Sequence, residues 1–179
     1  IKIYGTIHVS SVQENFLGIK VCAVSVNAQE MRVSMNNSTE KVKLSKVVDK
    51  MGLENLTPDV DTSGIWLHVP DVNRPALQLT GFYDQFDNDR IQVIGNVEYS
   101  YLKSLSEEDR VSRYSQLLSS NIPCLVFCRN LSPEPEILKI ASKYGIPILK
   151  SKGTTSAFVA EVIRWLNVQL APCIVIHGV

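Results

Sequence analysis

Apolar residues follow two alternating patterns along most of the chain. Residues 91–95 and 124–128 are short, almost continuous apolar runs of strand length, whereas residues 106–118, 133–144 and 154–170 carry apolar side chains at helical spacing. Strands that are apolar on both faces and are separated by helices favour a parallel sheet covered by helices. The pattern therefore predicts an α/β fold, a layered domain with a largely parallel sheet.

Helix boundaries are marked by capping residues. Gly52 is the predicted stop of a helix that carries Leu44, Val47, Val48 and Met51, and Gly145 is the stop of the helix opened by Pro133 and Pro135. Ser106 is the predicted N-cap of a helix whose first-turn acids suit the helix dipole. The longest helix is predicted from residue 154 to 170, with a buried face made of Val159, Ile163, Leu166 and Leu170.

Three shorter elements complete the predicted domain. Residues 65–69 have the composition of a strand, and residues 74–82 that of a short helix or turn opened by Pro75. Residues 146–149 form a short strand in which Pro147 requires either an edge position or a place among the first residues.

Residues 1–34 differ from the rest of the chain. Two β-rich runs, 1–9 and 18–26, have apolar residues largely at period two and could pair as a hairpin. Met35 and the polar residues after it look like an ordinary start with a lead-in. We therefore expect 1–34 to be a β-rich appendage of unknown role, either an extension or an integral part of the domain.

The composition is that of an ordinary soluble domain. Of the 179 residues, 45% are hydrophobic and 20% are charged, and 18 basic residues balance 18 acidic ones, so no net field favours nucleic acid or a membrane surface. No apolar stretch is long enough to span a bilayer, which predicts a cytoplasmic protein. The cysteines, Cys22, Cys124, Cys128 and Cys173, fit buried thiols better than a metal or disulfide site.

Several polar residues are candidates for a metal, anion or other functional site. His68 is expected to be a strand histidine with its hydrogen bonds satisfied, and His8 lies in the unexplained appendage. Asp84, Asp87 and Asp89 lack the glycine and the distal glutamate of a calcium loop, which favours a solvated turn. Residues 151–156 either cap the longest helix or attract an anion to its first turn. Arg74 and Arg90 are expected to hold neighbouring loops by hydrogen bonds.

Six segments together resemble a known family. They are 74–82, 90–95 with 98–102, 144–149, 169–172 and 176–179, the last reading Ile-His-Gly-Val. In this order and spacing they resemble the amino-terminal half of HPr kinase/phosphorylase, over about residues 40–179. That bacterial enzyme phosphorylates a serine of the phosphocarrier HPr with ATP or pyrophosphate and reverses this by phosphorolysis, in control of carbohydrate metabolism through catabolite repression.

The resemblance implies further properties. The family fold is similar to the first domain of peptidoglycan-building ligases, and the family enzyme is a cytoplasmic homohexamer that uses Mg²⁺. Residues 1–179 contain no G-x-x-x-x-G-K-S/T loop. In the family, that loop follows the histidine that matches His177. We therefore expect no cofactor or metal site in this segment, which should be inactive alone, with HPr and other copies of the chain as partners of the complete kinase.

His177 is the one residue to which the resemblance assigns a catalytic role, beside the transferring phosphate. The alternative is a strand-end histidine with a structural hydrogen bond. The predicted division is 1–34 for the appendage, 35–172 for the amino-terminal domain and 173–179 for the first strand of a truncated kinase domain. A rival hypothesis is a free-standing ligand-sensing or interaction module of the same fold with no catalytic half.

Overall fold

A five-stranded sheet organises the main body of the protein. The structure is a computed structural model that describes residues 20–23, 31–35, 41–171 and 173–178, with side chains for 41–171. The sheet has the order β4-β9-β8-β7-β6. Its strands are β4 (Glu54–Asn55), β6 (Val72–Asn73), β7 (Ile91–Ile94), β8 (Leu125–Phe127) and β9 (Ile148–Lys150). β6 to β9 pair in parallel and β4 is antiparallel to β9, which confirms the α/β fold with a largely parallel sheet.

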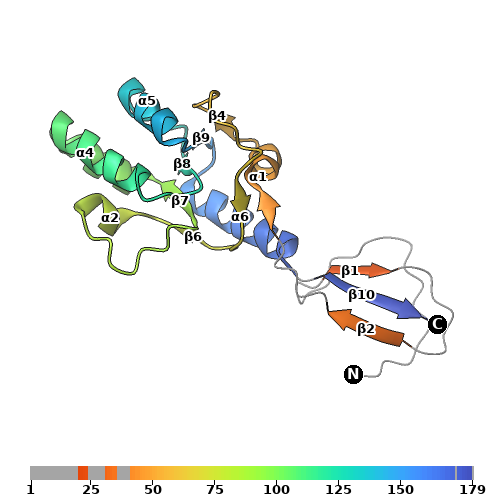
Figure 1. The fold of residues 1–179 in the computed structure, drawn as a ribbon. Coiled ribbons are helices and arrows are strands. Elements are labelled where there is room, and N and C mark those ends of the chain that lie inside the picture. Colours follow the sequence, from red (N-terminus) through yellow and green to blue (C-terminus); the bar gives the residue numbers. More distant parts are fainter. Residues whose placement is uncertain (1–19, 24–30, 36–40, 172, 179) are drawn as a thin grey trace.

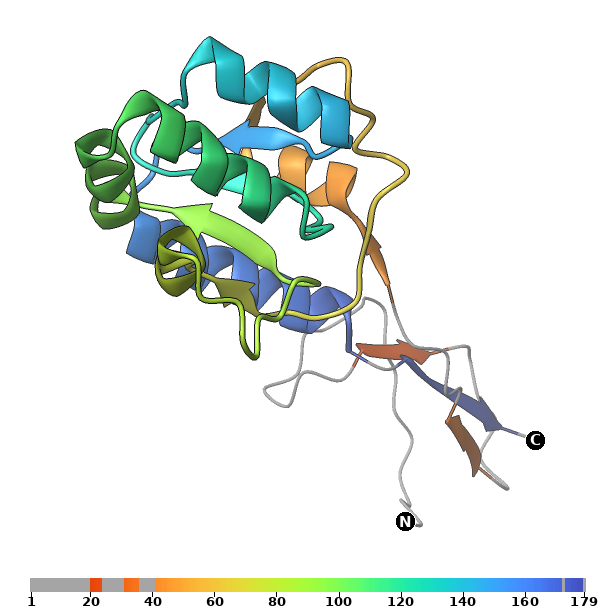
Figure 2. The same cartoon turned by 60° about the vertical axis from the view of Figure 1, so that its left-hand side comes forward.

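Helices cover both faces of this sheet (Figures 1 and 2). One face carries α2 (Ala76–Thr80), α3 (Asn96–Ser104), α4 (Glu107–Leu118) and α5 (Pro135–Tyr144), and the other carries α1 (Leu44–Met51) and α6 (Thr155–Gln169). Alternate residues of a strand serve the two faces: Val93 packs with α1 and α6, and Ile94 packs with α2 to α5. Two apolar cores, separated by the sheet, thus hold the body together.

Most predicted boundaries are confirmed. α1 ends at Gly52 with φ 60°, α5 ends at Gly145 with φ 70°, and the Ser106 hydroxyl accepts a hydrogen bond from the Asp109 N–H at the start of α4. The positive φ explains why glycine stands at the two helix ends. Pro147 directly precedes β9, so the strand lies inside the sheet without losing a ladder hydrogen bond to the proline.

Three sequence-based expectations need correction. The predicted strand 65–69 is only β5 (Trp66–Leu67), which pairs with β3 (Val42–Lys43) in a separate two-stranded sheet. His68 follows that strand and is exposed, so it does not lie within a strand as expected. The buried face of α6 consists of Thr155, Phe158, Val162 and Leu166, which shares only Leu166 with the predicted face. This helix is apolar on more than one side, so its periodicity did not determine which side faces the sheet.

A third sheet, of three strands, has the order β1-β10-β2. β10 (Cys173–Gly178) pairs in parallel with β1 (Lys20–Ala23) and antiparallel with β2 (Met31–Met35). Figure 1 shows this sheet beyond the end of α6. The first run of the predicted hairpin, residues 1–9, lies outside the described residues, and of the second run the described residues Lys20–Ala23 pair with β10. The boundaries at residues 34 and 172 stay predictions, and the first of them falls within β2.

Candidate functional site

His177 lies on β10, one residue before the end of that strand. In the antiparallel register with β2 it stands opposite Arg32, while its neighbour Ile176 pairs with Ala23 of β1. Its side chain is outside the part of the structure that describes side chains. The role that sequence analysis assigns to His177 therefore stays a prediction.

The main body brings several polar groups together where its parallel strands end. Gly95 follows β7, Cys128 follows β8 and Ser151 follows β9. We call Gly95 with residues 128–130 and 151–155 the carboxyl rim. Ligands of open α/β sheets commonly bind outside the carboxyl ends of the strands, so the carboxyl rim is the first place in the body to examine for a site.

Arg74 and Glu98 form an ion pair beside Gly95. Arg74 Nη2 lies 2.8 Å from one oxygen of Glu98 and donates a 2.9 Å hydrogen bond to the other. Glu98 Oε2 also accepts a 3.0 Å hydrogen bond from the Gly95 N–H, which caps the first turn of α3. The Glu98 side chain is 3% exposed and that of Arg74 is 46% exposed. The carboxylate is therefore buried, while part of the guanidinium faces solvent.

These contacts keep Glu98 ionised. Burial alone would raise the pKa of the Glu98 carboxyl, but the hydrogen bond from Arg74 and the N–H groups of Glu98 and Gly95 hold the pKa below its ordinary value. A buried carboxylate with two hydrogen-bonded partners is a fixed negative charge. Glu98 thus orients Arg74 and balances its single positive charge.

Close packing around Gly95 leaves no space for the side chain of a larger residue. A Cβ atom placed on Gly95 would lie 2.7 Å from Thr155 Oγ1 and 3.3 Å from both Arg74 Nη2 and Glu98 Oε2. Such a distance to a buried hydroxyl is too short for a real contact. The first turns of α3 and α6 therefore meet at Gly95 with no room for a side chain.

The turn after β8 has an unusual backbone. Arg129 and Asn130 have φ of 60° and 58°, in the left-handed region that non-glycine residues seldom adopt. The Arg129 N–H donates to the Gly153 carbonyl at 2.8 Å, and the Asn130 N–H donates to the Ser151 carbonyl at 2.9 Å. These two hydrogen bonds fasten the turn to the 151–154 segment that leads into α6.

Two hydroxyl groups of residues 151–156 bind backbone N–H groups at or just before the start of α6. Thr154 Oγ1 accepts a 3.3 Å hydrogen bond from the Ala157 N–H, and Ser151 Oγ accepts one of 3.3 Å from the Gly153 N–H. The cap hypothesis for this segment is confirmed, and the anion hypothesis stays a prediction. Lys152 is exposed and takes no part in it.

The pKa of the Cys128 thiol is influenced by polar and charged groups of the carboxyl rim. Burial raises the pKa of its thiol to about 11, while the Thr155 hydroxyl and the guanidinium groups of Arg74 and Arg129 act in the opposite direction. The Thr155 hydroxyl, at the start of α6, is the group that bonds to this thiol. Cys124, also buried, has its thiol pKa raised by desolvation, so both described cysteines are the buried free thiols that were predicted.

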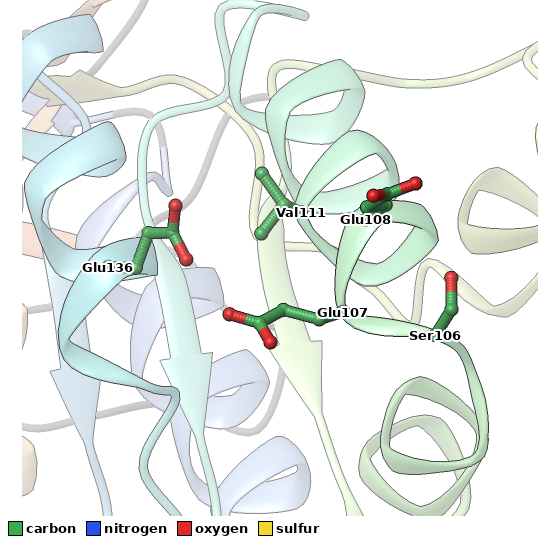
Figure 3. A pocket seen from close by; sticks show the side chains of 5 residues that line it. All are labelled: Ser106, Glu107, Glu108, Val111 and Glu136. Atoms are coloured by element: carbon green, nitrogen blue, oxygen red, sulfur yellow. The ribbon is translucent and has the colours of Figure 1, made fainter.

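A hollow elsewhere on the body is acidic. Glu107 and Glu108 of α4 and Glu136 of α5 line it with Ser106 and Val111, around a volume of about 520 Å³ (Figure 3). All three glutamates stand in first turns of helices, where the helix dipole favours them. Within the described part of the chain, no group of three or more His, Cys, Asp and Glu residues is arranged to hold a metal ion.

The remaining candidates are structural. Asp84, Asp87 and Asp89 are exposed, and Asp87 forms a 2.6 Å ion pair with Arg90. This confirms the solvated turn and the loop-holding role expected of Arg90. Sequence analysis singled out Arg74 and, within residues 151–156, Thr155, but it gave no role to Glu98 or Arg129. The available signal was Glu98 three residues after Gly95, the spacing of a carboxylate that caps a helix start.

Among the helices of the described residues, none is long and apolar enough to cross a membrane.

Comparisons with known proteins place the main body in one family. The family model described as HPr Serine kinase N terminus matches residues 42–166. A relative from Lachnoclostridium phytofermentans named HPr kinase/phosphorylase is 51% identical over 138 residues, which are 77% of this chain and 45% of the relative. One of the same name from Clostridium acetobutylicum is 38% identical over 139 residues, 78% of this chain and 45% of the relative. The chain thus spans less than half the length of these curated relatives.

One solved structure, of the CBS and DRTGG domains of the regulatory region of Clostridium perfringens pyrophosphatase complexed with diadenosine tetraphosphate, has a TM-score of 0.47. It is 16% identical, with 73% of this chain and 47% of that chain covered.

Proposed function

The chain belongs to the HPr serine kinase N-terminal family, and on this premise we propose that it is the amino-terminal regulatory or assembly domain of a bifunctional HPr kinase/phosphorylase. The proposed enzyme transfers phosphate from ATP or pyrophosphate to a serine of HPr and removes it by phosphorolysis. The observation that carries the proposal is the family match across residues 42–166, which takes in β3 to α6.

The proposal assigns different tasks to different parts of the protein. The body of residues 41–171 has a regulatory or assembly task, and β10 leads toward the catalytic part. The described residues contain no cluster that could hold Mg²⁺, so no catalytic step is assigned to that ion here. Nucleotide, Mg²⁺, hexamer formation, a cytoplasmic location and control of carbon metabolism belong to the proposed complete enzyme.

His177 is proposed as the residue of this chain that acts on the transferring phosphate. An imidazole at the end of a strand can orient or exchange a proton with a phosphate oxygen while positioning and charge neutralisation lower the barrier. Replacing His177 with Ala in the complete enzyme should reduce both the kinase and the phosphorolysis rates by about 10²- to 10⁴-fold. The melting temperature should stay near that of the parent.

The chain offers a matched control for this experiment. His68 is exposed and follows β5 in the main body, so His68→Ala should leave both rates unchanged. Equal rates in the parent and in a folded His177→Ala variant would remove His177 from the proposed site. A fall in melting temperature with unchanged activity per folded molecule would assign it a structural hydrogen bond instead.

The second candidate function is a free-standing ligand-sensing or interaction module. Two complete cores within residues 42–171 favour it, because such a body can fold without a catalytic half. The reading frame that contains this chain distinguishes the two functions. A G-x-x-x-x-G-K-S/T loop shortly after Val179 supports the enzyme, and a stop codon there supports the module.

A further inference from the structure

The carboxyl rim and its neighbour Arg74 gather basic side chains from three separate segments. Arg74 precedes α2, Arg129 follows β8 and Lys152 follows β9. Glu98 is the acidic residue in contact with this group, and it already forms an ion pair with Arg74. This group therefore carries an excess of positive charge, although basic and acidic residues balance over the whole chain.

The stability of the fold does not explain why an arginine stands at position 129. Its φ of 60° would suit glycine or asparagine better, because the Cβ atom of an arginine is strained there. The contact that fixes the turn uses only its backbone N–H. The side chain is exposed and makes no hydrogen bond or ion pair with any residue that the structure describes. An arginine with a strained backbone and no partner for its charged group indicates that the side chain binds another molecule.

The guanidinium group of Arg74 can bind a second partner while it stays paired with Glu98. Glu98 contacts Nη2 of its guanidinium with both carboxylate oxygens, and 46% of the Arg74 side chain stays exposed. A guanidinium has five N–H donors in a rigid plane, so this pairing leaves donors available. The buried carboxylate fixes the orientation of that plane.

Arg74 and Arg129 stand at the same part of the carboxyl rim. Arg74 Nη2 and Thr155 Oγ1 both lie beside Gly95, and the Arg129 N–H donates to the carbonyl of Gly153, two residues before Thr155. The side chain of Arg129 has no carboxylate partner among the described residues. Planar guanidinium groups match the oxygens of a phosphate, and each such contact is a charge-assisted hydrogen bond.

We propose that the carboxyl rim binds a phosphate-type oxyanion between Arg74 and Arg129, with Lys152 at its border. The anion is either free inorganic phosphate or the phosphate group of a small phosphorylated molecule. The group of three cations is too small for the extended basic surface that a nucleic acid needs. The proposal does not depend on phosphate transfer to HPr, because it concerns equilibrium binding to the main body.

The test is a titration of the 179-residue chain with sodium phosphate, followed by the amide signals of the protein in nuclear magnetic resonance spectra. A saturable shift is expected at the amides of residues 95, 128–130 and 151–153, with a dissociation constant on the order of 1 mM for so few contacts. Glycerol 3-phosphate is titrated in parallel. Tighter binding of this ester than of free phosphate would identify a phosphorylated molecule as the source, and the reverse order would identify the free ion.

Three variants make the test specific. Arg129→Gly relieves the backbone strain and removes the charge, so the melting temperature should equal or exceed that of the parent while phosphate affinity falls at least about tenfold. Arg129→Lys keeps the charge and should lose only part of the affinity. Lys139→Ala, which removes an exposed charge from α5, should bind phosphate as the parent does.

Two outcomes would overturn the proposal. One is the absence of a saturable shift at the rim, or shifts spread evenly over all basic residues. The other is an Arg129→Gly variant that is folded and binds phosphate as tightly as the parent. Neither outcome touches the proposed kinase function, which is measured on HPr.

Discussion

Glu98 is the one Asp or Glu that the described part of the chain buries. It joins three things at a single point: the start of α3 through the Gly95 N–H, the loop before α2 through Arg74, and the close packing against α6 at Thr155. An unpaired carboxylate in this place would be strongly unfavourable. The stability of the carboxyl rim therefore depends on the charge of this one residue.

This dependence gives a pH effect with a defined sign. Because the folded-state pKa of Glu98 is lowered, the carboxylate stabilises the fold above its ordinary pKa, and this contribution is lost as pH falls through the folded-state value. Glu98→Gln should reduce the free energy of unfolding by about 1–3 kcal/mol at neutral pH, and the difference should shrink in acid. Urea unfolding at both pH values measures it. The exposed Glu108→Gln is the control, and a deficit for Glu98→Gln that is equal at both pH values would contradict this role.

Gly95 provides a second prediction at the scale of the residue. Gly95→Ala brings a Cβ atom to 2.7 Å from Thr155 Oγ1, so the first turns of α3 and α6 must separate, at a cost of about 1–3 kcal/mol in unfolding free energy. Gly153→Ala in the same rim meets only Ser151 Oγ at 3.7 Å and should change the stability little. If thermal unfolding gives equal melting temperatures for the two variants, the close approach at Gly95 is not a constraint.

At the scale of the element, local signals predicted helix ends better than helix faces. Ser106, Gly52 and Gly145 act on the backbone next to them, so their effect is visible in the sequence. The face of α6 depends on what lies across the sheet, and its polar residue Thr155 is buried because its hydroxyl meets Cys128 and Gly95. No periodicity rule places a threonine on the buried side.

The candidate site was predictable only in part for the same reason. Arg74 stood out in the sequence, but its partner Glu98 is 24 residues away and α3, on which Glu98 lies, was not predicted. Arg129 gave no signal, because a positive φ at an arginine is visible only in the folded backbone. Tertiary contacts between separate segments create this site.

The corrected face of α6 can be tested with a pair of adjacent residues. Val162 is fully buried in the core shared with α1, whereas Ile163 is only partly buried. Val162→Ala should lower the free energy of unfolding by about 1.5–3 kcal/mol, and Ile163→Ala by less than about 1 kcal/mol although it removes more atoms. Chemical denaturation of both variants decides between the two faces. The reverse order would restore the face predicted from periodicity.

At the scale of the whole molecule, the five-stranded sheet of the main body and the three-stranded sheet differ in connectivity. The main body is built from residues 42–171 and has its own cores, whereas the three-stranded sheet joins β1 and β2 to β10 from the far end of the chain. β10 lies between the two other strands and carries His177. The environment of the proposed catalytic residue thus depends on the segment before Met35.

Removal of residues 1–34 tests whether the main body is stable without the three-stranded sheet. The body should keep a cooperative unfolding transition, because none of its core residues is lost, while the amides of β10 should exchange with solvent faster without β1 and most of β2. Calorimetry and hydrogen exchange measure the two effects. Loss of cooperative unfolding would show that the early strands belong to the core of the body.

The most direct test of the proposed function is phosphate transfer by the purified product of the complete reading frame that contains this chain. It is incubated with HPr and Mg²⁺ and with either ATP or pyrophosphate, and phosphoserine on HPr is measured by mass spectrometry. The proposed function predicts phosphoserine with both donors, its removal when inorganic phosphate replaces them, and none with residues 1–179 alone. A folded product that leaves HPr unmodified with either donor would contradict it.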